Sequence, residues 1–325
     1  MGAILKTVVV VVIAASGAIA AGQTTAQGFP TKPIRLIVPS AAGGGPDTSA
    51  RILAGELGKQ IGRQVVVDNR PGASNIIGFE AIALSQPDGY TLGFVNFPVA
   101  TNPSMYSKLP YDSAKDFNPV ILNASTMNLL TVTPSLPARS VRELIDYARA
   151  HPGKLLYGAQ GAGNSQQLSL ELFKFMTGTE INPVFYKGIH QAILDEIAGQ
   201  VHIVCDNLSS VLPHVKAGRI RALGVTALKR SAILPEMLTL DEAGIPGYEL
   251  TPWSGFVVPA RTPRDIVLRL NTDTNRVLLS PSVVNAYSAR GTTLIGGTPE
   301  KFGEHIRLET EKWAKVIKAA GIRSN

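Results

Sequence analysis

The chain alternates short apolar runs with amphipathic segments, and glycine-rich turns separate them. Residues 34–39 form an apolar run typical of a buried parallel strand. Residues 47–61 follow and predict a helix with its leucine and isoleucine side chains on one face. Alternation of this kind predicts an α/β fold in which a mostly parallel sheet carries helices on both faces.

The alternation restarts after about residue 120, so we expect two αβ halves. The chain is predicted to cross between them near residues 120–126 and 223–229. The remaining predicted strands are 65–67, 91–95, 129–133, 155–158, 201–205 and 223–226, and the remaining helices are 75–84, 141–150, 165–176, 192–198, 263–279 and 299–320.

The N-terminus has the pattern of a secretory signal. Lys6 precedes the apolar run 7–15, and Ala18-Ile19-Ala20 has the small residues that signal peptidase accepts. The apolar run is too short for a membrane anchor. We therefore expect residues 1–26 to be a signal peptide, cleaved after Ala20 or Ala26, and the mature protein to be exported.

Charge and cysteine content exclude several classes of protein. The 31 Lys and Arg residues against 24 Asp and Glu residues give a net charge of +7, but they form no long basic run, which argues against nucleic-acid binding. The single cysteine, Cys205, excludes an intrachain disulfide and a cysteine-clustered metal site. Because residues 201–204 before it are mostly apolar, we expect a buried, unreactive thiol.

Two glycine-rich segments lie where a predicted strand leads into a helix. Residues 40–48 read SAAGGGPDT and residues 158–165 read GAQGAGNS. Glycine lets main-chain N–H groups approach a ligand, and a helix N-terminus favours anions. The two segments facing each other would hold two ends of a small anion. The alternative is a pair of ordinary turns, with Asp47 in one and Asn164 or Ser165 in the other acting as helix caps.

Other polar residues are weaker candidates. Asp206 and Asn207 follow a predicted strand and would point into the same site, although helix capping is the alternative. Lys187 and His190 would add positive charge, with solvent exposure as the alternative.

The sequence has no sign of catalysis. It contains neither a G-x-S-x-G nor an H-E-x-x-H motif, and its five histidines lack metal-ligand spacing. We expect no catalytic residues, no metal and no cofactor.

Motifs along the whole mature chain resemble those of the periplasmic solute-binding proteins of tripartite tricarboxylate transporters, the Bug family. The matching motifs are FPTKPIRLIVP (29–39), VDNRPGA (67–73), PDGYTL (87–92), LPYD (109–112), YKG (186–188), DNL (206–208), PHVKAG (213–218), EAGIPGY (242–248) and GTPE (297–300).

The resemblance implies a two-lobed periplasmic-binding-protein fold of type II, a Venus flytrap with its ligand cleft between the lobes. Lobe 1 would comprise residues 27–122 plus 228–325, and lobe 2 residues 123–227. The expected ligand-binding residues are Ser40, Ala41, Gly43, Gly44, Asp47, Asn96, Gly161, Gly163, Asn164, Ser165, Lys187, Asp206 and Asn207. Relatives commonly have an aromatic residue where this chain has Ser40, and other residues where it has Gln166-Gln167. Asn123 and Asn128, near the first crossing, are expected to add polar contacts.

The resemblance further implies a monomeric binding protein that captures a small organic carboxylate, aliphatic or aromatic, and delivers it to the membrane permease subunits of the transporter. Two alternatives stay open: a periplasmic module that senses the ligand and signals to a receptor, and a secreted hydrolase.

Overall fold

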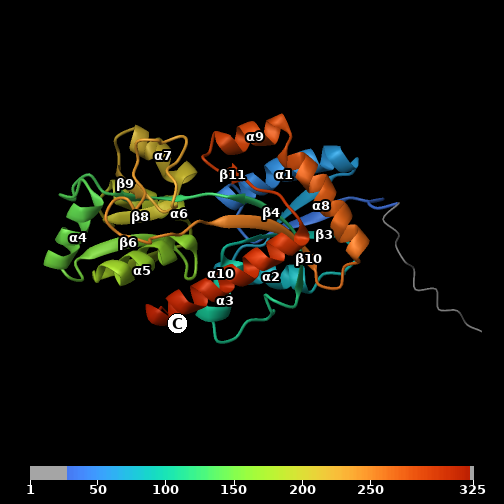
Figure 1. Ribbon diagram of the computed structural model, residues 1–325, viewed down its shortest axis with the longest axis horizontal. Coiled ribbons are helices and arrows are strands. Elements are labelled where there is room, and N and C mark those ends of the chain that lie inside the picture. Colours follow the sequence, from blue (N-terminus) through green and yellow to red (C-terminus); the bar gives the residue numbers. More distant parts are fainter. Residues whose placement is uncertain (1–27, 323–325) are drawn as a thin grey trace, which may run out of the picture.

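The computed structural model describes residues 28–322, which form two β-sheets flanked by helices (Figure 1). The expected signal peptide, residues 1–26, lies outside the described residues. Within the described part, no helix is both long and apolar enough to cross a membrane.

The first sheet has the strand order β11-β4-β10-β3-β1-β2. We call this sheet and its helices lobe 1. Its strands are β1 (Ile34–Val38), β2 (Val65–Asn69), β3 (Thr91–Asn96), β4 (Phe117–Ser125), β10 (Trp253–Pro259) and β11 (Thr293–Leu294). Its helices are α1 (Gly45–Ile61), the short η1 (Ala73–Asn75), α2 (Ile76–Ala83), α3 (Pro98–Met105), α8 (Arg264–Leu278), α9 (Pro281–Ser288) and α10 (Pro299–Ala319).

The second sheet has the order β7-β6-β8-β5-β9, and with its helices it forms lobe 2. Its strands are β5 (Asn128–Val132), β6 (Leu155–Gln160), β7 (Ile181–Tyr186), β8 (Ile203–Asn207) and β9 (Arg221–Val225). Its helices are α4 (Val141–Ala150), α5 (Ser165–Thr177), α6 (Ile189–Ile197) and α7 (Leu208–Lys216).

Both sheets are mixed, but most strands of each sheet run in one direction, as expected. β1, β2 and β3 are parallel, as are β6, β7 and β8. However, β10 runs antiparallel to β3 and β4, and β5 runs antiparallel to β8 and β9. The antiparallel pairs arise because β4, β5, β9 and β10 carry the chain between lobes rather than back through a helix within one lobe.

The two crossings lie side by side. β4 ends at Ser125 in the first sheet and β5 begins at Asn128 in the second. The main-chain N–H of Thr126 donates to the carbonyl of Pro252 at 2.8 Å, and that of Thr226 donates to the carbonyl of Asn128 at 3.0 Å. The outgoing and returning segments therefore support each other where the lobes join.

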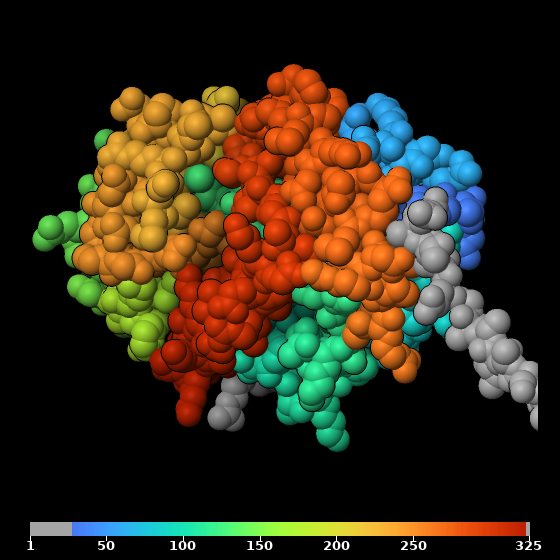
Figure 2. All heavy atoms as spheres, turned by 45° about the vertical axis from the view of Figure 1, so that its right-hand side comes forward, coloured from blue at the N-terminus to red at the C-terminus, as the bar shows by residue number. Residues whose placement is uncertain are grey.

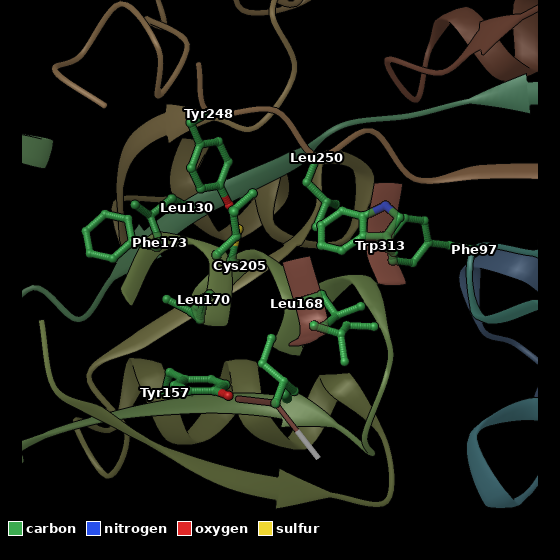
Figure 3. Close-up of a cluster of buried hydrophobic side chains, with 14 of the residues drawn as sticks. Phe97, Leu130, Tyr157, Leu168, Leu170, Phe173, Cys205, Tyr248, Leu250 and Trp313 are labelled. Atoms are coloured by element: carbon green, nitrogen blue, oxygen red, sulfur yellow. The ribbon is translucent and has the colours of Figure 1, made fainter. Parts of the chain in front are cut away.

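One apolar cluster runs from lobe 1 into lobe 2 (Figure 3). Phe97 packs edge-on against Trp313 of α10, with ring centroids 5.1 Å apart. Leu250 lies next to Trp313, and Leu168 of α5 lies on the lobe 2 side of the pair. Separate clusters fill the opposite faces of the two sheets. The lobes thus have their own cores and share apolar contacts on one side of the crossings.

Candidate functional site

Six helices begin directly after the parallel strands of the two sheets. In lobe 1, α1 follows β1, η1 and α2 follow β2, and α3 follows β3; in lobe 2, α5, α6 and α7 follow β6, β7 and β8. None of α1, α2, α3, α5, α6 and α7 has a hydrogen bond from its N-cap side chain. The helices α8 and α9 also lack one, whereas α4 and α10 each have one. The first N–H groups of these six helices therefore lack that partner, and each helix end carries partial positive charge.

The two glycine-rich segments share one local design. Gly43 has φ +81° and Gly163 has φ +76°, a backbone that favours glycine. Asp47 Oδ2 accepts the N–H of Gly43 at 2.8 Å, and Gln167 Oε1 accepts the N–H of Gly163 at the same distance. In each lobe a side chain from the first helical turn thus holds the loop four residues before it.

Asp47 is fully engaged inside lobe 1. The carboxylate is 3% exposed and also accepts hydrogen bonds from Arg51 Nε at 3.0 Å and Asn69 Nδ2 at 2.9 Å. Burial alone would raise the pKa of Asp47, but the hydrogen bonds from Arg51, Gly43 and Asn69 outweigh it and lower the pKa. Asp47 therefore stays ionised, and its hydrogen bond to Gly43 holds the loop between β1 and α1 in place.

The two lobes touch at both glycine-rich segments. Thr101 Oγ1 of α3 donates to the carbonyl oxygen of Gly163 at 2.9 Å. A Cβ atom on Gly161 would lie 3.5 Å from Ser74 Oγ, and one on Gly45 would lie 3.9 Å from Asn207 Nδ2. The structure thus brings the first segment next to the end of β8, and the second next to η1 and α3.

A further contact between the lobes lies next to the end of β8. Figure 2 shows the gold surface of lobe 2 meeting the orange-red surface of lobe 1 along a groove. A Cβ atom on Gly291, after α9, would lie 2.8 Å from Leu208 Cδ2 at the start of α7. The lobes are therefore close together at the expected sites of ligand contact and beyond them.

Sequence reasoning did not find the left-handed segment of η1. Ala73, Ser74 and Asn75 have φ values of 44°, 51° and 72°. Asn75 Nδ2 donates to Asn96 Oδ1 at 2.8 Å, and Asn102 Nδ2 donates to the Ser74 carbonyl at 3.1 Å. Positive φ at three consecutive non-glycine residues is costly and persists only where neighbours hold it. The Pro71-Gly72 turn before it was the only signal in the sequence.

Buried polar atoms without hydrogen-bond partners gather where the lobes meet. Among the described residues, eight of the eleven such side-chain atoms belong to residues at the strand and helix ends that face the boundary. They are Ser40 Oγ, Asn102 Oδ1, Asn123 Nδ2, Asn123 Oδ1, Asn128 Oδ1, Gln166 Oε1, Asp206 Oδ2 and Asn207 Oδ1. Folded proteins contain few unpartnered buried polar atoms, so their concentration beside six helix N-termini marks a candidate polar site.

Asp206 is the one charged residue among these eight atoms' residues, and it is 1% exposed. Its Oδ1 accepts a hydrogen bond from Gln166 Nε2 at 2.8 Å. Burial raises the pKa of Asp206, although the N–H of Asn207 and the amide of Gln166 oppose the rise. Lys187 and His190, by contrast, are exposed. The nearby Cys205 is a free, buried thiol, as expected, and burial raises its pKa.

The remaining expected residues lie on the loops themselves. Ser40, Ala41, Gly43 and Gly44 connect β1 to α1, Gly161 and Asn164 connect β6 to α5, and Ser165 is the first residue of α5. Asn164 donates its side-chain amide to the carbonyl of Gln160 instead of capping α5. Within residues 28–322, no group of three or more His, Cys, Asp and Glu residues is placed to hold a metal ion.

Comparison with known proteins assigns the family. Residues 49–322 match the family described as the tripartite tricarboxylate transporter family receptor. The chain belongs to this family. Its members are solute-binding receptors of the periplasm, and the resemblance predicted from the sequence motifs is confirmed.

Individual receptors and structures agree with this assignment. The protein BugT of Bordetella pertussis is 35% identical over 321 residues, or 98% of each chain. The R. palustris Rpa4515 structure with adipate is 41% identical with a TM-score of 0.86, covering 90% of this chain and 98% of its own. MatC from Rhodopseudomonas palustris with bound malate is 27% identical with a TM-score of 0.83, covering 89% and 100%. The predicted periplasmic-binding-protein fold is therefore confirmed.

Proposed function

We propose that this receptor captures a small organic carboxylate between its two lobes and delivers it to the permease subunits of a tripartite tricarboxylate transporter. The observation that carries the proposal is the set of six helix N-termini without N-cap side-chain bonds beside the unpartnered polar atoms at the lobe boundary. The adipate and malate in the two similar structures support the ligand class.

The chemistry of the site suits an anion without a buried lysine or arginine. Main-chain N–H groups at the starts of α1 and α5 would donate to carboxylate oxygens, and the aligned peptide dipoles favour negative charge there. The segments 40–48 and 158–165 belong to different lobes, so a ligand contacting both would stabilise the closed arrangement. In this proposal the lobes are residues 27–122 with 228–325 and residues 123–227.

Thermal unfolding and calorimetry with a panel of mono-, di- and tricarboxylates test the ligand class. We expect at least one acid to raise the melting temperature and to be recovered unchanged afterwards. The corresponding amides, which lack the negative charge, should leave the melting temperature unaltered. Equal stabilisation by acids and amides, or chemical turnover of the acid, would contradict the proposal.

Uptake measurements test the membrane partner. A strain that lacks the gene should lose uptake of the bound acid and regain it when the full chain is restored. If binding is intact but uptake does not depend on the gene, the receptor serves sensing rather than transport.

A further inference from the structure

Gln166 presents a hydrogen-bond acceptor at the lobe boundary. It lies in the first turn of α5 and is 9% exposed. Its Nε2 donates to Asp206 Oδ1 at 2.8 Å, and this contact directs the nitrogen toward Asp206. The other terminal atom, Oε1, has no hydrogen-bond partner. An amide oxygen accepts hydrogen bonds and cannot donate them. A group that binds next to Gln166 Oε1 therefore has to be a hydrogen-bond donor.

Its neighbour Asn207 at the end of β8 adds an acceptor of the same kind. Asn207 Oδ1 is also a buried atom without a hydrogen-bond partner. Asp206, by contrast, also receives hydrogen bonds from the Asn207 N–H and the Ser210 hydroxyl. Asn207 comes within reach of the first glycine-rich segment, because a Cβ atom on Gly45 would lie 3.9 Å from Asn207 Nδ2. This wall of lobe 2 therefore offers acceptor oxygens, whereas the helix N-termini around it offer N–H donors.

A carboxylate without a donor group pairs with the N–H donors of the helix N-termini but not with the acceptor oxygens of lobe 2. Its oxygens pair with N–H groups but leave Gln166 Oε1 and Asn207 Oδ1 unpaired, and unpaired buried acceptors are costly. We propose that the ligand is a carboxylate bearing a hydrogen-bond donor, a hydroxyl or an ammonium group, and that Gln166 Oε1 selects it with Asn207 Oδ1. This inference rests on the proposed function and specifies its ligand.

Matched acids that differ in a single substituent test the selection. One series is succinate, malate and aspartate; a second is glutarate, 2-hydroxyglutarate and glutamate; a third is adipate, 2-hydroxyadipate and 2-aminoadipate. Calorimetry should show a substituted acid binding at least about tenfold more tightly than its plain parent, as expected when a site built for a donor meets a ligand that lacks it. Comparing the affinities of the hydroxy acids with those of the amino acids shows which of the two donors the site binds.

The variant Gln166→Met keeps the length of the side chain and removes both the acceptor Oε1 and the Nε2 donor to Asp206. It should reduce the preference to about twofold or less while the plain acid still binds. Gln191→Met is the matched control, because Gln191 is exposed on α6 of the same lobe. This control should keep the wild-type preference. Circular dichroism checks that both variants are folded.

The possible failures are distinct. Binding of plain and substituted acids with equal affinity, or tighter binding of the plain acids, overturns this inference and leaves the proposed function standing. A preference that survives in folded Gln166→Met overturns the role of Gln166. If no acid of any series binds to the wild-type protein, the proposed function fails, and this inference fails with it.

Discussion

Gly43 and Gly163 lie at equivalent places in two loops that are far apart in the sequence. Both have a left-handed backbone, and each donates its N–H to a side chain four residues later. The surroundings of the two glycines differ. A Cβ atom on Gly163 would lie 3.4 Å from both Asn102 Oδ1 and Met105 Cγ of lobe 1, whereas one on Gly43 would meet no atom within 4 Å.

Gly163→Ala should therefore affect both stability and binding. The left-handed backbone should cost about 1 kcal/mol of unfolding free energy with alanine, and the added methyl group would contact α3 of the other lobe. Gly178→Ala is the control, because Gly178 has φ +63° in the same lobe and its Cβ would meet open space. Denaturant unfolding should show a similar loss for both variants, while calorimetry shows weaker ligand binding only for Gly163→Ala. Equal affinities would contradict the interlobe role of Gly163.

At the scale of elements, α6 packs a carboxyl group against the second sheet. Glu196 is completely buried, and its Oε2 accepts a hydrogen bond from Thr131 Oγ1 of β5 at 3.1 Å. Burial raises the pKa of Glu196 from 4.5 to about 8, against the opposing effect of the Thr131 hydrogen bond. The folded protein therefore binds a proton here that the unfolded chain releases at lower pH.

The free energy of unfolding should fall as pH rises between the two pKa values of Glu196, 4.5 and about 8. In this window the native state holds more protons than the unfolded state, so stability decreases with pH. Urea unfolding of the wild type and Glu196→Gln measures the effect, and the variant should have a flatter profile. Glu180→Gln, at an exposed position in the same lobe, serves as control. Identical slopes for the wild type and Glu196→Gln would refute this prediction.

The elements that sequence reasoning missed have compositions that obscure their periodicity. α3 contains Pro98, Asn102 and Pro103, and α7 contains Pro213, so neither has a clear helical pattern. β7 exposes Asn182 and Pro183, as an edge strand permits. These elements form because their neighbours hold them: α3 packs along α10, and β7 pairs with β6. By contrast, α4 was predicted with its exact ends, because Ser140 caps a strongly amphipathic segment.

At the scale of the molecule, one hydrogen bond joins α3 of lobe 1 to the second glycine-rich segment of lobe 2. Thr101 is fully buried, and its Oγ1 donates to the carbonyl of Gly163. Closing the lobes over a ligand would form this bond, and opening them would expose both groups to water. In the proposed closure, this bond would contribute to the balance between open and closed arrangements.

Thr101→Val removes the donor and keeps the shape of the side chain. We expect ligand affinity to fall by about threefold to tenfold, the usual contribution of one hydrogen bond. Thr274→Val is the matched control, because Thr274 is equally buried but bonds to Leu270 within its own helix. Calorimetry compares the affinities, and small-angle scattering follows lobe closure. Unchanged affinity and closure in Thr101→Val would rule out this role.

The amino-acid sequence alone predicts the alternation of strands and helices, the two glycine-rich segments and the family, because periodicity, turn residues and motifs are local properties of the chain. Which residues contact one another depends instead on tertiary packing. Ser74, Thr101 and Asn102 come from segments without a ligand-binding signal, and Gln166 gains its significance only through Asp206, forty residues later. The antiparallel crossings bring the two lobes together, and contacts between residues so distant in the chain depend on that packing rather than on any local pattern.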